Sequence, residues 1–328
     1  MSSPRSRVTT LARHEYRAAV RSRALVSLIA ILAIVTFVSI YIAAIAYRSA
    51  LADYEVYVAA AQAGGVQIIA PSPLRLLSLL RGAIEYIEIV GAIIAITLGY
   101  LTVSRERANR TLPLLRSRPV TSGELATGSA LGALGIISTL VLVTGIVALL
   151  CLGLIGNSWA TPYEVFKVGL VGIASVLYMF VFYSLGALIT ARTRVAANGL
   201  LIALGIWLLV ALILPQIGDT LDADNQIPGG LFSALAVDKA QETEILTHFG
   251  TYEFVRTGIE ELSFAKHYER FAFAMSDVQD KYQGFTLAQL AREKWHDIVW
   301  MFVYAVALGY GLWRGFRRQP ALPQGEKS

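Results

Sequence analysis

Six long apolar stretches constrain this chain more than any other feature of its sequence. A helix needs about 20 residues to cross roughly 30 Å of hydrocarbon, and each stretch is close to that length. In lipid the backbone must satisfy its own hydrogen bonds, so helices are the expected state. We therefore predict an all-α polytopic membrane protein with six transmembrane helices, over Ala24–Tyr47, Gly82–Val103, Ala130–Cys151, Phe166–Thr190, Asn198–Ile217 and Ile298–Gly315.

Composition agrees with a lipid environment. The 328 residues are 55% hydrophobic and 16% charged, whereas soluble domains carry about a quarter charged residues. The net charge of +5 raises the question of nucleic acid. However, the basic residues lie at the ends of the apolar stretches and no basic patch is interleaved with stacking aromatics, so we exclude nucleic acid as a partner. The single cysteine, Cys151, excludes an intrachain disulfide and a cysteine-based metal site.

The arginines indicate the orientation, because basic residues accumulate in short cytoplasmic loops. The alternate short loops hold only Arg48, Arg75, Arg81 and Lys167. Both termini are therefore expected in the cytoplasm of a multi-pass protein of the cell (inner or plasma) membrane. The basic residues that fix this orientation are Arg5, Arg7, Arg13, Arg17, Arg21, Arg23, Arg105, Arg107, Arg110, Arg116, Arg118, Arg192, Arg194, Arg314, Arg317, Arg318 and Lys327.

The remaining segments divide the chain further. Apolar and basic residues alternate at helical spacing before the first span, which favours an amphipathic helix on the anionic leaflet; an ordinary basic flank is the alternative. We expect Leu74–Leu80 to lie along the outer surface, and Thr286 to cap a helix that runs through Trp295 into the sixth span. The predicted parts are a cytoplasmic N-terminal helix (1–23), helices one to five (24–217) with an outer loop (48–81) and a cytoplasmic loop (104–125), a mainly helical extracytoplasmic domain (218–297), helix six (298–315) and a cytoplasmic tail (316–328).

The cytoplasmic loop after the second span has an unusual composition. A charged segment is followed by three leucines, a break at Pro119, and a capping box from Thr121 to Glu124 that begins the third helix. Exposed leucines between charges favour contact with another protein. A basic loop that only sets topology is the alternative.

This stretch resembles the type-2 (exporter-type) ABC permease family, whose members carry a Glu-Arg-x-x-Gly-Thr-Leu-x-Leu-Leu-x-Ser-x-Pro-like segment and then a Glu-Leu-x-x-Gly helix start. Arg110 departs from the usual glycine, and Ser129 from the frequent lysine. The large outer segment is similar to the branch linked to multicopper-enzyme maturation, which includes the copper-processing permease of nitrous oxide reductase. The matching residues are Arg105, Glu106, Arg107, Thr111, Leu112, Leu114, Leu115, Ser117, Pro119, Glu124, Leu125 and Gly128.

The resemblance implies a mechanism. Two permease subunits, as a homo- or heterodimer, sit on two ABC ATPase subunits, and the chain either exports a substrate or performs mechanical work on an extracytoplasmic partner protein. ATP is held by the ATPase, because the chain has no phosphate-binding P-loop sequence. The chain then is not itself an enzyme and binds no cofactor directly. The residues implied to couple it to the ATPase are Arg105, Glu106, Arg107, Thr111, Leu112, Leu114, Leu115, Pro119 and Glu124.

Two acidic residues are further candidates. Glu85 and Glu88 are three residues apart, so we expect them to share a helix face near the outer end of the second span. They are candidates for lining an exit path. An interfacial ion pair with Arg81 is the alternative.

Two other functions remain open. An ion-coupled carrier would need inverted repeats and broken helices with charges at the midplane. An intramembrane enzyme would need a nucleophile and a base, or metal ligands, on facing spans. The four histidines are scattered along the sequence and complete no zinc pattern.

Overall fold

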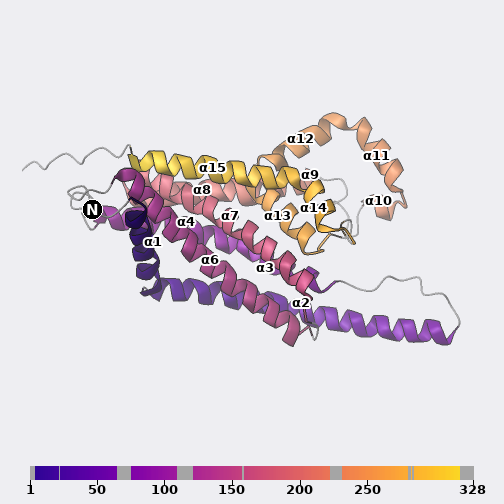
Figure 1. The fold of residues 1–328 in the computed structure, drawn as a ribbon. Helices are drawn as coiled ribbons and strands as arrows, with labels where there is room; N and C mark the ends of the chain where they lie inside the picture. The colour runs from indigo at the N-terminus through magenta and orange to yellow at the C-terminus, as the bar shows by residue number, and fades with distance from the viewer. Residues whose placement is uncertain are drawn as a thin grey trace, which may run out of the picture.

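The computed structural model describes residues 4–21, 23–64, 75–108, 121–156, 159–221, 231–279, 282 and 284–317. Within these residues the chain is a bundle of helices without strands (Figure 1). Six helical runs are long and apolar enough to cross a membrane, which confirms the expected fold class. They are Val26–Ala63, Leu76–Arg105, Gly123–Leu154, Pro162–Arg192, Ala196–Leu221 and Trp295–Gly315.

The spans run alternately between two ends of the bundle. We call the end that carries the N-terminal helix the near end, and the opposite one the far end (Figure 1). Four of these spans are single helices, and the other two contain irregular turns. The elements of the spans are α1 (Pro4–Arg21), α2 (Arg23–Ala63), η1 (Leu76–Leu80), α3 (Arg81–Tyr86), η2 (Ile87–Gly91), α4 (Ala92–Ala108), α6 (Ser122–Leu154), α7 (Pro162–Arg192), α8 (Ala196–Trp207), η3 (Leu208–Ile213), α9 (Leu214–Leu221) and α15 (Trp295–Arg317).

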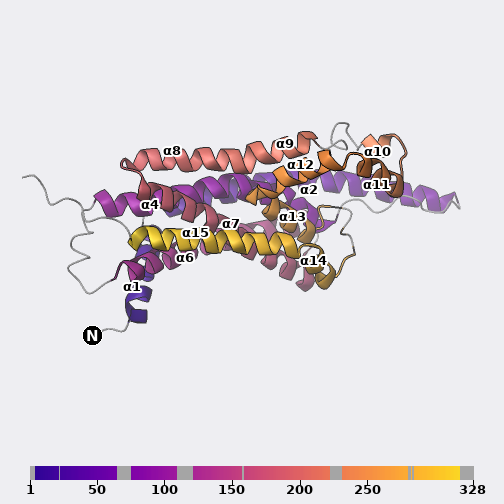
Figure 2. The same cartoon turned by 90° about the horizontal axis from the view of Figure 1, so that it is seen from above.

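Helices α4 and α7 cross at the centre of the bundle, with α6, α8 and α15 packed around them (Figure 2). Gly99 of α4 faces the backbone of Tyr183 and Ala187, and Gly186 of α7 faces Ile96. A Cβ atom on Gly186 would lie only 2.5 Å from the carbonyl oxygen of Ile96. Small residues at a crossing let two membrane helices approach closely, and this close contact fixes the core of the bundle.

Two spans contain a π-helical segment, η2 and η3. A π turn disturbs the regular hydrogen-bond ladder, and a backbone carbonyl freed in this way needs another donor inside a membrane. The hydroxyl of Tyr178 donates to the carbonyl of Glu88 in η2 at 2.8 Å. The hydroxyl of Ser263 donates to the carbonyl of Val210 in η3 at 2.7 Å. A side chain of α7 and the N-cap side chain of α13 therefore stabilise the two irregular turns.

In the described part of the segment between the fifth and sixth spans, five short helices lie at the far end (Figures 1 and 2). One of them, α13, is almost fully buried and packs against α7 and α15. The turn that follows it is fixed to α7 by a buried ion pair in which Lys167 Nζ lies 2.8 Å from each carboxylate oxygen of Asp277. The five helices are α10 (Leu231–Ala234), α11 (Lys239–His248), α12 (Gly250–Glu261), α13 (Phe264–Met275) and α14 (Leu287–Glu293).

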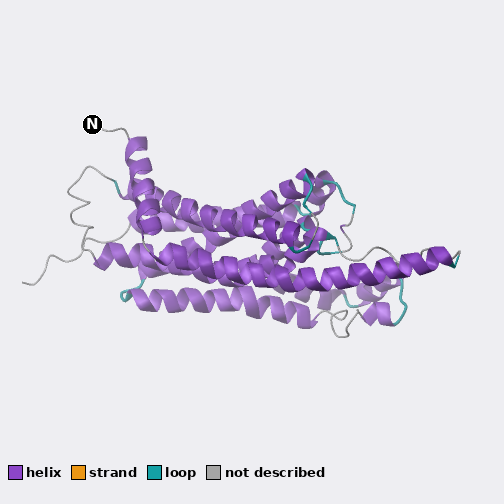
Figure 3. Cartoon of the chain, turned by 90° about the horizontal axis from the view of Figure 1, so that it is seen from below, coloured by secondary structure: helices purple, strands orange, loops and turns teal. Residues whose placement is uncertain are grey.

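Three local expectations are corrected by the structure. The Leu74–Leu80 segment does not lie along a surface in its described part, because Leu76–Leu80 forms a 3₁₀ turn with four buried leucines that leads into the second span. Helix α2 continues to Ala63 and extends past the rest of the bundle (Figure 3). Thr286 does cap a helix, but that helix ends at Lys294, where the backbone leaves helical geometry before α15 begins.

Candidate coupling site

The near end is built around the packing of α1 on α6. Gly128 and Gly132 of α6 leave space for Leu11 and Glu15, because a Cβ on either glycine would lie 2.6 Å from the Cβ of its partner. Tyr16 hydrogen-bonds Thr139 at 3.0 Å. The apolar side of α1 therefore packs on a protein surface. Its exposed side carries Arg5, Arg13, Arg17 and Arg21.

Glu124 joins three parts of the near end. One carboxylate oxygen accepts from the Arg7 guanidinium at 2.8 Å, which ties α1 to α6. The other accepts from the backbone N–H of Thr121 at 2.8 Å, and the Thr121 hydroxyl accepts from the N–H of Glu124 in return. The capping box predicted from the sequence is thus confirmed. It begins α6 directly after residues 109–120, which lie outside the described part of the chain.

The Arg7→Gln variant tests the tie between α1 and α6. Removing the guanidinium leaves the capping box in place, so only the docking of α1 should weaken. We expect amide exchange in α1 to become about three- to tenfold faster while exchange in α6 stays unchanged. Hydrogen–deuterium exchange measures both helices in one experiment. Arg13→Gln, which changes an exposed arginine on the same helix, is the matched control, and an equal effect of both variants would contradict the tie.

Arg107, at the end of α4, bonds to the end of α7. Its guanidinium donates to the carbonyls of Thr193 at 2.9 Å and Ala191 at 2.8 Å. The last carbonyls of a helix lack intrahelical donors, and a cation there also complements the helix dipole. Arg107 therefore fixes the near end of α4 against that of α7. Sequence reasoning selected this residue but did not identify its partner.

For the other residues selected from the sequence, the structure gives fewer contacts or none. Arg105 lines a small cavity of about 30 Å³ together with Glu15, Thr102 and Ser129. Glu106 lies within α4, and nothing is described of its side chain. Thr111, Leu112, Leu114, Leu115 and Pro119 lie outside the described residues.

Glu85 and Glu88 do not share one environment, although they are three residues apart. Glu85 is partly exposed and pairs with Arg81 at 2.9 Å. Glu88 lies in the π turn and is 8% exposed. The irregular turn begins at Ile87, between Glu85 and Glu88, and contains Glu88; it changes the helical phase, which a regular 3.6-residue period does not anticipate.

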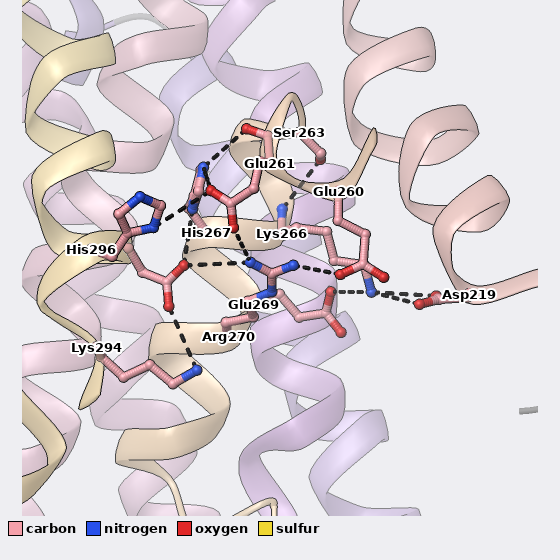
Figure 4. Close-up of polar contacts among 11 residues, drawn as sticks. Asp219, Glu260, Glu261, Ser263, Lys266, His267, Glu269, Arg270, Lys294 and His296 are labelled. Carbon is pink, nitrogen blue, oxygen red and sulfur yellow. Dashed lines mark hydrogen bonds and ion pairs between the residues drawn. The ribbon is translucent and has the colours of Figure 1, made fainter. Parts of the chain in front are cut away.

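A network of charged residues at the far end was not recognised from the sequence (Figure 4). His267 is fully buried, and its Nδ1 lies 2.9 Å from Asp297 Oδ1. Arg270 pairs with Glu260 and, at 2.8 Å, with Glu261. The sequence of α13 does place charged residues between aromatic ones, which could have indicated the network. However, the residues that pair with these charges come from distant segments. These include Asp297 on α15 and, through Lys266 at 2.9 Å, Asp219 on α9.

The network keeps its cations charged. Burial acts to lower the pKa of Lys266, but the charge of Glu269 and hydrogen bonds to Asp219 and Glu269 outweigh it, so this pKa is raised. Burial opposes the charge of Arg270 in the same way, and Glu261 and Glu260 reverse the effect and raise its pKa. Among the described residues, no three His, Cys, Asp or Glu side chains are grouped so as to hold a metal ion.

Comparison with known proteins identifies the family. No curated protein matches the chain in sequence. Residues 9–319 match the family described as ABC-2 family transporter protein, which covers all six membrane-spanning helices. The match is to this family as a whole and assigns the chain to no branch of it. The chain therefore belongs to the ABC-2 transporter family and is a multi-pass membrane permease component of an ABC transporter.

Proposed function

We propose that this permease couples ATP hydrolysis by separate ABC ATPase subunits to export across the membrane. The observation that carries the proposal is the position of Glu124, which bonds α1 and begins α6 immediately after residues 109–120. A force applied to that loop would reach α6 through its capped first turn and α1 through Arg7. Arg107 would carry the same force from the end of α4 to α7.

The proposed orientation follows from the arginines. We place the near end, with both termini and residues 109–120, in the cytoplasm, where the ATPase binds ATP. The far end then faces the outside. The permease acts as a dimer, identical or mixed, because an ATPase pair presents two docking sites. ATP stays on the ATPase, and the permease contributes binding and movement only.

Co-purification tests the proposed partner. Glu106→Ala combined with Leu114→Asp should abolish association with the ATPase, since the end of α4 loses a charge and the loop after it loses an apolar side chain, while membrane insertion stays intact. The tagged chain is purified from membranes in mild detergent, and the accompanying ATP hydrolysis is measured. Glu244→Ala, an exposed residue at the far end, is the control. Unchanged ATPase recovery with the double variant would overturn the role of this loop.

A second form of the function is mechanical work on an extracytoplasmic partner. Exposed apolar side chains favour it at the far end, outside the membrane-spanning segments: Leu235, Phe249, Phe254 and Leu262. These side chains are available for contact with a protein partner, and contiguous apolar surface outside the membrane is typical of such contacts. In this second form, the same residues at the near end transmit the force. The two forms differ only in whether the far end moves a substrate or a partner protein.

A further inference from the structure

His267 is a buried imidazole whose two ring nitrogens both face acceptors. Its side chain, on α13, has no exposed surface. Nδ1 lies 2.9 Å from Asp297 Oδ1 on α15, and Nε2 lies 3.2 Å from the backbone carbonyl oxygen of Glu261, the last residue of α12 (Figure 4). An ionised carboxylate and a carbonyl can only accept, and a neutral imidazole carries a single N–H. Both bonds therefore form together only when His267 is protonated on both nitrogens.

His296 connects this buried ring with the surface of the far end. The indole N–H of Trp300, which can only donate, bonds His296 Nε2 at 3.0 Å, so His296 is neutral and carries its proton on Nδ1. That nitrogen lies 3.5 Å from Glu261 Oε2, a buried oxygen that lies 3.7 Å from His267 Nε2 and accepts no hydrogen bond within the described chain. The side chain of His296 is 49% exposed. The Glu261 carboxylate therefore offers a route for a proton between an exposed and a buried imidazole.

The charges around His267 balance when it is protonated. Among the described residues, contacts of 3.8 Å or less join this ring, besides the neutral His296, to two cations and three carboxylates. With a neutral His267 ring the group has one carboxylate in excess, whereas an imidazolium makes it neutral as a whole. Buried charges are costly unless opposite charges compensate them, so this packing fits the protonated form. The two cations are Arg270 and Lys294, and the carboxylates are Glu260, Glu261 and Asp297.

Other charged groups near α13 belong to separate pairs. Lys266 is paired with Asp219 and Glu269. Among the described residues, none of these three forms a hydrogen bond or ion pair with His267. The same holds for the titratable groups that the other packed elements bring near α13, which are Arg81 and Glu85 (α3), Glu88 (η2), Lys167 and Tyr178 (α7) and Tyr304 (α15).

The turn that His267 holds also supports the fifth span. Ser263 lies two residues after Glu261, and its hydroxyl bonds the carbonyl of Val210 in η3 at 2.7 Å. A neutral His267 has one N–H to share between two acceptors. It keeps the bond to Asp297, because a hydrogen bond to an ionised carboxylate is the stronger one, and loses the bond to Glu261. Loss of the proton therefore loosens residues 261–263 and, through Ser263, the π turn of the fifth span.

We propose that His267 is a pH-sensitive latch at the far end of the permease. In its protonated form it ties α13 to α15 and to the end of α12, and it holds the turn that supports η3. This contribution is present at low pH and is lost as the pH rises and the ring gives up its proton. Histidine side chains change charge between about pH 5 and pH 8, which places the transition in a physiological range. The latch acts within the permease and does not depend on the ATPase.

The protonation state can be observed directly in the purified full-length permease in detergent. The chain has four histidines, so labelling with ¹⁵N-histidine gives few side-chain NMR signals. His14→Gln, His248→Gln and His296→Gln assign the other three, and the remaining signal belongs to His267. We expect both His267 nitrogens to be protonated at about pH 5.5 and only one at about pH 8. A neutral ring at the lower pH, or an imidazolium at both, would overturn the proposal.

Hydrogen–deuterium exchange measures the release of the turn. The amides of Leu262, Ser263 and Lys266 form hydrogen bonds there. After correction for the intrinsic effect of pH, they should exchange about three- to tenfold faster at about pH 8 than at about pH 5.5, the factor that one hydrogen bond contributes. In His267→Gln, whose side chain does not titrate, exchange should be equally fast at both pH values.

His248→Gln is the matched control for this measurement. It makes the same chemical change at an exposed histidine of α11, whose ring contacts only the Glu244 carbonyl of its own helix among the described residues. This variant should retain the full pH effect. A pH effect that persists in His267→Gln, or none in the wild type, contradicts the latch. If His267→Gln does not fold, the wild-type NMR titration and exchange still decide the question.

Discussion

Gly99→Ala is expected to destabilise the permease by about 3 kcal/mol or more, which is at the upper end for adding atoms to a packed core. The added methyl group would overlap the Tyr183 carbonyl oxygen and lie 2.7 Å from the Ala187 nitrogen. Both are backbone atoms, so no side-chain rotation relieves the clash and α4 must separate from α7. Unfolding in mixed detergent micelles, followed by circular dichroism, measures the loss.

Gly205→Ala is the matched control, because it makes the same chemical change in a helix where a Cβ meets no atom within 4 Å. Alanine is favoured over glycine in a helix by up to about 1 kcal/mol, so this variant should be as stable as the wild type or slightly more stable. Equal destabilisation by both variants would show that the crossing of α4 and α7 is not the tight contact described above.

The second large effect concerns the buried ion pair between α7 and the turn after α13. Lys167→Met should cost about 3–5 kcal/mol, because it leaves Asp277 buried without a counter-charge. Lys167 is 3% exposed, and its ammonium contacts both oxygens of Asp277. The same unfolding measurement applies. The far-end helices should lose protection from amide exchange before the spans do, since α13 is the element released.

A double variant separates the effect of an unpaired buried charge from the contribution of the ion pair itself. Lys167→Met with Asp277→Asn removes both charges and should recover a large part of the stability lost in the single variant. Glu85→Gln provides the comparison with a more exposed ion pair and should change stability by less than about 0.5 kcal/mol. If Lys167→Met were as mild as Glu85→Gln, the buried pair would not hold α13 in place.

Features with a local cause were the ones that the sequence predicted well. Six spans follow from the length of the apolar runs, and both the Thr121 and the Thr286 caps follow from residues three apart. The break at Lys294 was missed because the sequence there continues the helical pattern. The extension of α2 to Ala63 was missed because its polar residues resemble those of a loop while remaining compatible with a helix.

Contacts between distant residues could not be predicted. Lys167 and Asp277 are 110 positions apart, and His267 and Asp297 are 30 apart. No periodicity connects such pairs, because tertiary packing alone brings them together. The π turns also depend on distant residues, because Tyr178 of α7 and Ser263, the N-cap of α13, stabilise them. In isolation, the segments Ile87–Gly91 and Leu208–Ile213 look like ordinary apolar helix. This is why Glu88 was expected on the same face as Glu85.

The glycine crossing has a geometric consequence for any tilting of α4. Gly99 is eight residues from Arg107 and eleven from Glu88, which are distances of about 12 Å and about 16 Å along a helical axis. With Gly99 as the pivot, the two arms are unequal, so a sideways displacement at the near end becomes a displacement about one-third larger, in the opposite direction, at the far end. If the second span tilts as one body about Gly99, small motions at the near end are therefore enlarged where Glu88 lies.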